Sequence, residues 1–325
     1  MRFSVLDRAN TIAGLSESEV LRGVIDHARS VEKLGFTRFL VAEHHAVPGI
    51  PGSQPTVLAA AVAAQTERIR VGTGGIMLPN HLPLIAAEQI ATLEALFPGR
   101  IDAGIGNSVG FTAPVRDALR QGDPRELKAG YRDDLGELLS YLEGTAAITA
   151  RPFNQARTPV WILAGFRSIA LAAELGLGMI IGGPSLVAGE GDSHQGLDYY
   201  RENFRPSPFA AEPRVIISLD LAVADTTAAA RDLLLPEAWS NALSRRTGSF
   251  SHLAPVADLD ENALSAQDRG RIEDRLAAAV YGTPPEVGER LGEITRYTGA
   301  EEVLVTGGMS DLAGRARSEE LLAEL

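Results

Sequence analysis

The chain has 325 residues, of which 45% are hydrophobic and 22% charged, and this composition is typical of a globular protein with a large buried core. Its formal net charge of -12 disfavours nucleic acid as a partner, because binding a phosphate backbone requires a surplus of basic side chains. The absence of cysteine excludes disulfides and thiolate chemistry. We find neither a signal peptide nor a run of ~18 apolar residues, so we expect no membrane contact and a cytoplasmic location.

Short β-rich segments alternate with longer helical segments along the whole chain, which is the pattern of βα units around a parallel sheet. The predicted strands cover residues 3–6, 39–42, 69–72, 101–105, 160–163, 179–181, 215–223 and 303–305. The predicted helices cover residues 16–34, 55–66, 83–96, 125–142 and 168–175, and a last helix ends the chain. Eight parallel strands favour an α/β fold of the closed type, a single (β/α)8 TIM barrel, over an open sheet.

We expect one domain over residues 1–325, because no linker, internal repeat or low-complexity tract divides the chain. The region at about 240–267 contains no clear strand, and we interpret it as an insertion before the last βα unit. Residues 182–196 contain Gly and Pro and are a second candidate for a mobile loop. Such insertions often cover the C-terminal mouth of a barrel.

Two motifs stand where predicted strands end. Glu43, His44 and His45 follow the second strand, and a carboxylate with two imidazoles at a strand exit indicates chemistry, although a satisfied polar cluster is an alternative. A metal site is disfavoured, because neighbouring strand residues point to opposite faces. Gly74 and Gly75 follow the third strand, where glycine allows a sharp bend or the close approach of a flat ligand; tight helix packing is the alternative.

Several segments, taken in order, resemble the bacterial-luciferase-like flavin-dependent monooxygenases. They are VAEHH (41–45), VGTGGIMLPNH (71–81), EQ (88–89), LEALFPGRID (93–102), GIG (104–106), AAELG (172–176), ADT (224–226) and GTP (282–284). No single segment is specific, but the ordered set runs nearly from end to end. The resemblance implies a (β/α)8 barrel, usually a homodimer, that binds FMN at the C-terminal ends of its strands.

The resemblance also implies roles for the two motifs. His44 would lie near the flavin as a candidate general base, since imidazole titrates close to neutral pH. Glu43 would orient or polarise His44. The bond between Gly74 and Gly75 would be a cis peptide placed against the flavin ring.

The chain departs from the family pattern at two places. Related chains commonly carry arginine where this chain has Asn107, so a charged contact to the flavin or its phosphate is lost. After the fifth strand, where serines usually help to bind phosphate, this chain has Gly165, Phe166, Arg167 and Ser168. Backbone N–H groups at the start of the next helix, with Arg167 or Ser168, remain as candidates for that role, and a surface charge is the alternative for Arg167.

Other residues carry weaker expectations. We expect His27 at the surface of the first helix and His81 as an ordinary loop histidine. Asp7 is either a turn residue at a strand end or part of the pocket. Core packing is the default for Phe111 and Trp239, with a role in the pocket wall as the alternative.

The leading hypothesis is a two-component flavin-dependent monooxygenase, which takes reduced FMN from a separate flavin reductase and uses O2 to oxygenate a small organic substrate. An F420-dependent oxidoreductase on the same barrel is the first alternative. A non-catalytic flavin-binding protein is the second, although the presence of Glu43 and His44 argues against a complete loss of catalysis. The sequence does not identify the substrate.

Overall fold

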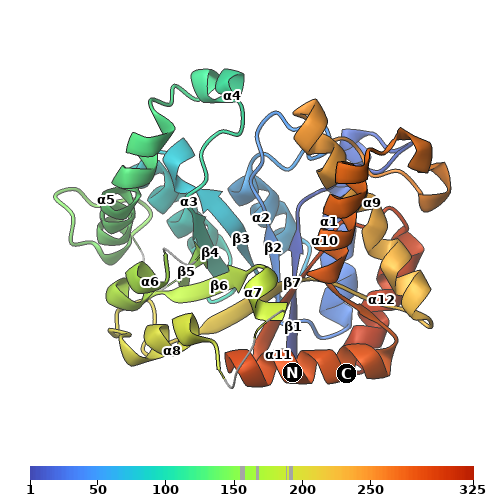
Figure 1. Cartoon of the computed structure of the whole chain (residues 1–325). Helices are drawn as coiled ribbons and strands as arrows, with labels where there is room; N and C mark the ends of the chain where they lie inside the picture. Colours follow the sequence, from blue (N-terminus) through green and yellow to red (C-terminus); the bar gives the residue numbers. More distant parts are fainter. Residues whose placement is uncertain (154–157, 166–167, 188, 190–192) are drawn as a thin grey trace.

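The fold is a closed barrel of parallel strands surrounded by helices (Figure 1). It is seen in a computed structural model that describes residues 1–153, 158–165, 168–187, 189 and 193–325. Both chain ends lie at the same end of the barrel, at the bottom of Figure 1. The predicted (β/α)8 TIM barrel is therefore confirmed.

The strands are β1 (Arg2–Asp7), β2 (Arg38–Val41), β3 (Arg70–Met77), β4 (Ile101–Gly106), β5 (Val160–Ala164), β6 (Gly178–Gly182), β7 (Val215–Val223), β8 (Val280–Gly282) and β9 (Glu302–Thr306). The α-helices are α1 (Glu17–Lys33), α2 (Pro55–Ala64), α3 (Pro83–Leu96), α4 (Ala113–Ala118), α5 (Pro124–Glu143), α6 (Ile169–Leu175), α7 (Pro184–Val187), α8 (Gln195–Glu202), α9 (Thr227–Thr247), α10 (Ala266–Ala277), α11 (Pro284–Thr298) and α12 (Leu312–Ala323). Short 3-10 helices are η1 (Leu78–Asn80), η3 (Val256–Asp258) and η4 (Glu261–Ala263).

The barrel strands pair in the order β1-β2-β3-β4-β5-β6-β7-β9, and β9 pairs with β1 to close the ring. The sequence did not predict β8, which pairs only with the C-terminal end of β7, outside the ring. With three residues, β8 is too short to show a strand pattern. It joins α10 and α11 to the rim of the barrel.

The two segments interpreted as loops contain helices. In the region 240–267, α9 continues to Thr247, and η3, η4 and the start of α10 follow. In the segment 182–196, α7 lies at Pro184–Val187 and α8 begins at Gln195, while residues 188 and 190–192 lie outside the described residues. Short helices such as α7 carry too few residues to show a period of 3.6.

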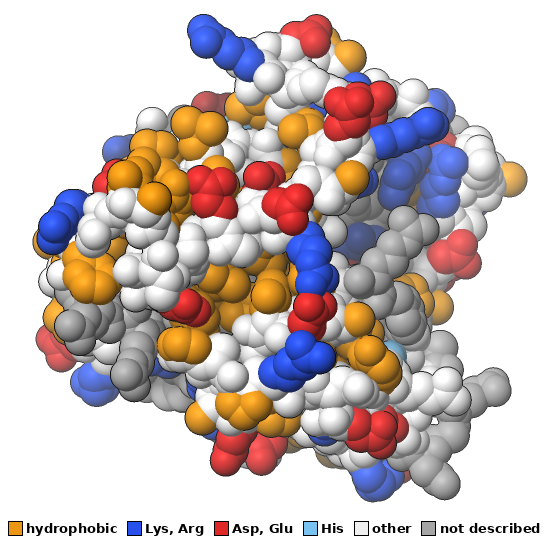
Figure 2. All heavy atoms as spheres, turned by 90° about the vertical axis from the view of Figure 1, so that its left-hand side faces the viewer, with side chains coloured by type: hydrophobic (Ala, Val, Ile, Leu, Met, Phe, Trp, Pro, Cys, Tyr) orange, Lys and Arg blue, Asp and Glu red, His pale blue; other side chains and the backbone are white. Residues whose placement is uncertain are grey.

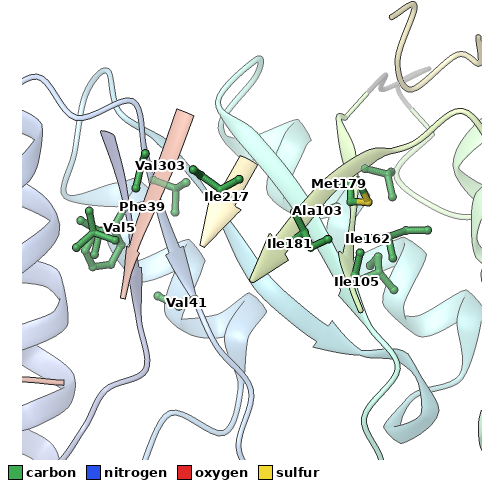
Figure 3. Packing of buried hydrophobic residues seen from close by; sticks show 14 of the residues in the cluster. Val5, Phe39, Val41, Ala103, Ile105, Ile162, Met179, Ile181, Ile217 and Val303 are labelled. Carbon is green, nitrogen blue, oxygen red and sulfur yellow. The ribbon is translucent and has the colours of Figure 1, made fainter. Parts of the chain in front are cut away.

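Alternation along the strands divides their side chains between two layers. Outward-facing residues pack against the helices, and Figure 3 shows part of this layer, including Val5 of β1, Phe39 of β2 and Ile217 of β7. The inward-facing residues of the middle layer form a separate apolar cluster. This cluster consists of Leu6, Leu40, Trp161, Ile180, Leu163, Ile216 and Leu304.

Below this apolar cluster, a buried ionic network fills the N-terminal end of the barrel. Arg38 at the start of β2 donates from Nη1 to Asp102 of β4 at 2.9 Å and from Nη2 to Glu302 of β9 at 2.8 Å. Asp102 also accepts from Nε of Arg70 at 2.7 Å and from Nε1 of Trp161 at 3.0 Å. The Arg38 guanidinium lies 4.9 Å from the centre of the Trp161 ring. Since Trp161 belongs to β5, the Arg38 cation connects β2, β4, β5 and β9 across the barrel.

The expectation that His27 lies at the surface is wrong. His27 is buried, with Nδ1 at 2.6 Å from Asp7 Oδ2 and Nε2 at 2.6 Å from Glu319 Oε1. Burial and Arg315 oppose protonation, but the charge of Glu319 and both hydrogen bonds raise the pKa of His27. Burial would raise the pKa of Asp7, but the hydrogen bond and charge of His27 lower it to about 2. His27 therefore ties α1 to β1 and α12.

Within the described residues, no helix is long and apolar enough to cross a membrane. The outer surface is mixed: on the face shown in Figure 2, apolar side chains gather in patches between acidic and basic ones. Apolar side chains at the surface of a folded domain are normal.

Replacing Arg38 with Met is expected to lower the free energy of unfolding by about 3–5 kcal/mol, because the substitution removes the cation that pairs with Glu302 inside the barrel. Arg29→Met is the control. Arg29 pairs with Asp26 at 3.7 Å on the exposed face of α1, and its loss should cost roughly 1 kcal/mol or less. Urea unfolding measures both values, and equal losses for the two variants would show that the Arg38 network does not support the barrel.

Candidate functional site

The carboxylate of Glu43, directly after β2, is the centre of a buried polar cluster at the C-terminal end of the barrel. Its Oε1 accepts from Nδ2 of Asn80 at 2.7 Å and lies 2.8 Å from Nε2 of His45. Its Oε2 accepts from the backbone N–H of Met77 at 2.9 Å and lies 2.9 Å from Nε2 of His81. The side chain of Glu43 is fully enclosed. Two strand ends, those of β2 and β3, are joined by this one side chain.

The Glu43 carboxylate is ionised. Burial would raise its pKa, but the hydrogen bonds from His45 and His81 and the bond from Asn80 lower it to about 2. The expectation that His81 is an ordinary loop histidine is wrong, because its ring contacts Glu43. One feature of the sequence indicates this contact. His81 follows Gly74-Gly75 closely, at the point where the chain leaves β3 next to the end of β2.

His44 does not join the Glu43 cluster. Glu43 accepts from His45, His81, Asn80 and Met77, and no hydrogen bond to the His44 side chain is found among the described residues. Glu43 therefore acts on His44 through its charge and not through the direct hydrogen bond that an orienting role would require. In the described part of the chain, Nδ1 of His44 is buried without a hydrogen-bond partner.

The His44 imidazole is held in its neutral form. Burial lowers the pKa of His44, and the nearby charge of Arg8 lowers it further, so that it falls to about 4 despite the opposing charges of Glu43 and Glu237. A neutral imidazole with an unpartnered ring nitrogen can accept a proton from a group placed against it. His44 is thus a neutral imidazole that lines the cavity beside it.

A small cavity of about 120 Å³ lies beside this imidazole. It is lined by Glu43, His44, His45, Met77, Asn80, Ser108, Val109, Gly110 and Phe111. The Phe111 ring stacks on the His44 ring with centroids 5.9 Å apart and planes inclined by 16°. With 63% of its surface exposed, Phe111 belongs to the wall of this cavity and not to the core. Trp239 of α9, in contrast, is buried in a cluster that includes Ile272 and Leu276 of α10.

A larger cavity of about 240 Å³ opens at the centre of the barrel mouth, above the inner apolar cluster. It is lined by Leu6, Gly74, Leu163, Ala164, Gly165, Ile180, Gly182, Ser218 and Leu304. A Cβ atom at Gly74 would lie 2.5 Å from Leu6 Cδ1, and one at Gly75 would lie 2.7 Å from the carbonyl oxygen of Gly104. The predicted cis peptide between Gly74 and Gly75 is confirmed. A Cβ at Gly75 would meet backbone and one at Gly74 would meet the Leu6 side chain, and glycine leaves the cavity wall at Gly74 without a side chain.

The structure brings only some of the predicted cofactor residues together. Gly74 and Gly165 line the same cavity. Ser168 is buried and donates its backbone N–H to the carbonyl oxygen of Gly165 at 2.9 Å. Asn107 follows β4 as an exposed residue and lines neither cavity. Phe166 and Arg167, also predicted to bind the cofactor, lie outside the described residues.

Sequence reasoning missed a second charged cluster at the mouth. Arg8, just after β1, pairs with Glu237 of α9 and lies 3.5 Å from Asp220 of β7. Arg275 of α10 lies 2.8 Å from Asp220 and 2.8 Å from Glu237. These pairs fasten α9 and α10 to the rim. No short motif connects residues so far apart in the chain, so the sequence carried no signal for them.

The residues at the mouth suit a flat aromatic cofactor of the flavin type. The glycine wall leaves room for a ring, and the inner apolar cluster would exclude water from one side of it. The unpartnered Nδ1 of His44 supplies a polar atom nearby. Within the described residues, no group of three or more His, Asp or Glu side chains is arranged to hold a metal ion.

Known proteins share both the sequence and the fold. A protein of Escherichia coli K12 named luciferase-like monooxygenase is 31% identical over 330 residues, which cover 99% of this chain and 96% of that protein. The crystal structure of apo-MsnO8 is 32% identical, covers 99% of this chain and 97% of its own, and has a TM-score of 0.84. A third relative is the oxygenating constituent of 3,6-diketocamphane monooxygenase of Pseudomonas putida, whose structure was solved in complex with FMN. It is 18% identical, covers 100% of this chain and 97% of its own, and has a TM-score of 0.73. At this identity the comparison shows a similar fold and nothing more.

A sequence model of the family described as luciferase-like monooxygenase matches residues 1–302. The matched range contains Glu43, His44, Gly74 and Gly75, and thus the polar cluster and the glycine wall. With this match and the barrel, the chain belongs to the luciferase-like monooxygenase family.

Proposed function

We propose that this protein is the oxygenating component of a two-component monooxygenase that uses reduced FMN and O2. The observation that carries the proposal is the wall without a side chain at Gly74, which faces a cavity with an apolar floor at the barrel mouth. Reduced FMN, bound there, would supply the electrons for oxygen activation. One oxygen atom would enter a small organic substrate and the other would leave as water. A separate flavin reductase would provide the reduced cofactor.

The chain itself would bind the ring, exclude water and move a proton. Leu6, Leu163 and Ile180 form the apolar floor that keeps water from the buried side of the ring. Gly165 and Ser168, with Phe166 and Arg167, are the proposed phosphate side of the site, and Ser168 begins the helix that follows β5. Water exclusion strengthens every polar contact inside such a site.

His44 is proposed as the general base. Its Nδ1 has no partner among the described residues, and its low pKa keeps the imidazole neutral at neutral pH. Glu43 is proposed to support it from a distance, by holding His45, Asn80 and His81 in place around it. The proposal thus keeps His44 and Glu43 in the site. Glu43 was expected to orient His44, but it contacts the side chains around His44 instead.

An anaerobic titration of the purified protein with reduced FMN, oxidised FMN and F420, followed by rapid mixing with O2, tests the proposal. Saturable binding of reduced FMN and an O2-dependent change in flavin absorbance that differs from free flavin are the expected results. Proteins of the same fold include F420-dependent enzymes. Binding of F420 but not of FMN would show that F420 is the cofactor. Binding of FMN without any change in its reactivity with O2 would indicate a non-catalytic flavin-binding protein.

We further propose that the protein is a homodimer joined through α2 and α3. The sequence of α2 contains no charged residue, and α3 contains only Glu88 and Glu94. Helices that are apolar on nearly every side are normally buried. Here, however, Val57 is 67% exposed and Leu82, at the start of α3, is 71% exposed. A second copy would cover these side chains.

The double variant Val57→Asp/Leu82→Asp is expected to be monomeric, because the new charges would be buried without partners in the dimer. Light scattering after size-exclusion chromatography measures the mass. Ile148→Asp/Leu312→Asp is the matched control, since those residues are also exposed but lie on other elements. A monomeric natural protein, or a variant that stays dimeric, would contradict this interface.

Replacing His44 with Ala is expected to slow the proton-dependent step after O2 mixing on the order of 100-fold, with little loss of stability. In the natural protein this step should keep its rate from pH 8 to pH 5, because His44 stays neutral until the pH falls to about 4. Stopped-flow absorbance and thermal unfolding are the measurements, and His252→Ala, at an exposed position, is the control. An unchanged rate in the His44 variant would remove this residue from the mechanism.

Replacing Asn107 with Arg is expected to tighten the binding of reduced FMN, because a charge-assisted hydrogen bond to an anionic part of the flavin contributes roughly 1.5–3 kcal/mol. Asn107 is exposed at the end of β4, so the longer side chain has room to reach the mouth. The dissociation constants of both proteins are compared by anaerobic titration. If they are equal, Asn107 does not face the anionic part of the cofactor.

A further inference from the structure

The segment between β4 and α5 holds an exposed aromatic ring against His44. Phe111 is 63% exposed, yet its ring is stacked on the imidazole with centroids 5.9 Å apart. In the stretch from Asn107 to Asp123, only Gly110 and Val115 are buried, so little core packing holds this segment down. In Figure 1 its helix α4 stands clear of the barrel at the top. The position of Phe111 must therefore depend on polar contacts.

Those polar contacts converge on Gln121. Its Oε1 accepts the backbone N–H of Gly110 at 3.0 Å, next to Phe111 in the chain. Its Nε2 donates to Oδ1 of Asn80 at 2.6 Å and to the carbonyl oxygen of Pro79 at 3.1 Å. Asn80 in turn donates to Glu43 at 2.7 Å. A continuous chain of hydrogen bonds thus leads from the buried carboxylate to the backbone beside Phe111.

Arg116 reinforces the same place. Its Nη1 donates to the carbonyl oxygen of Gly110 at 2.9 Å. Both backbone groups of Gly110 are therefore used by side chains of this segment, one by Gln121 and one by Arg116. A residue fixed at both its N–H and its C=O has little freedom to rotate, so the adjacent Phe111 ring is held where it lies.

We propose that Gln121 is a positioning residue, which holds the Phe111 ring over His44 and thereby shields the imidazole and its cavity from water. The cavity of about 120 Å³ has Phe111 as part of its wall. Removing the ring or releasing the segment would open this cavity to solvent. Any molecule that reaches His44 would have to displace the ring or pass beside it, so this segment also limits the size of the substrate.

The shielding has a measurable consequence. Burial is the largest cause of the low pKa of His44, and the charged groups that act on this imidazole are Arg8, Glu43, Glu237 and His45. None of these four groups is itself changed in a Phe111 or a Gln121 variant, and Glu43 keeps its bonds from His45, His81 and Met77. Admission of water would favour the protonated imidazole, so the pKa of His44 should rise from about 4 toward its ordinary value of 6.5.

The test is an NMR titration of histidine-labelled protein without flavin. The protein has six histidines, and the His44 signal is assigned by its absence in His44→Gln. We expect the pKa of His44 to rise in Phe111→Ala and in Gln121→Leu, while the pKa values of the histidines far from the mouth stay constant. The double variant should show no larger rise than Phe111→Ala alone, because in this proposal Gln121 shields His44 through the ring. Gln267→Leu, on the exposed side of α10, should change nothing.

An unchanged pKa of His44 in Gln121→Leu, or additive rises in the double variant, would overturn the proposal. If Gln121→Leu does not fold, Arg116→Met tests the same attachment of Gly110, because it removes the hydrogen bond to the Gly110 carbonyl oxygen. An unchanged pKa of His44 in Arg116→Met would equally contradict the proposal. The catalytic role of this shielding rests on the proposed function, whereas the shielding itself does not. Because the titration needs neither flavin nor substrate, failure of the monooxygenase assignment would leave its result unaffected.

Discussion

The interaction on which the rest of the structure depends is the guanidinium of Arg38 between Asp102 and Glu302 at the closed end of the barrel. A ring of parallel strands needs its inner side chains to fill the centre, and here β2, β4 and β9 meet through one cation. The carboxylates are out of water, so each needs this partner. By fixing where these strands begin, the network also fixes how the strands are placed along the barrel axis.

Along the barrel axis the interior changes from charged to apolar to bare backbone. Above the Arg38 network lies the apolar cluster around Leu40, and above that cluster lie Gly74 and Gly75, which carry no side chain. In the part of the chain that the structure describes, charged groups return at the rim, in the Glu43 cluster and in the pair between Arg8 and Glu237. This sequence of layers places a dry floor beneath a polar edge. A planar, partly charged cofactor needs both.

The sequence predicted what depends on local pattern. Most ring strands contain a short run of apolar residues, and the helix predicted over residues 16–34 matches α1, which begins with a capping box of Ser16 and Glu19. The errors concern residues whose partners lie far away. His27 stands on the buried face of α1 in line with Val24 and Val31, but nothing local showed that Asp7 and Glu319 would meet it. Glu43 was found as a site residue, whereas its contact with His81 depends on the pairing of β2 with β3 and the turn after β3.

Glu43 also determines the proton positions of its neighbours. An ionised carboxylate only accepts hydrogen bonds, so His45 and His81, which approach it through Nε2, must each carry a proton on that nitrogen. Their tautomers are fixed, and neither Nε2 remains available as a base. His44 stands outside this arrangement, with Nδ1 unpartnered among the described residues. Three imidazoles therefore lie where β2 and β3 end, and the carboxylate binds two of them, while the third stays neutral and faces the small cavity.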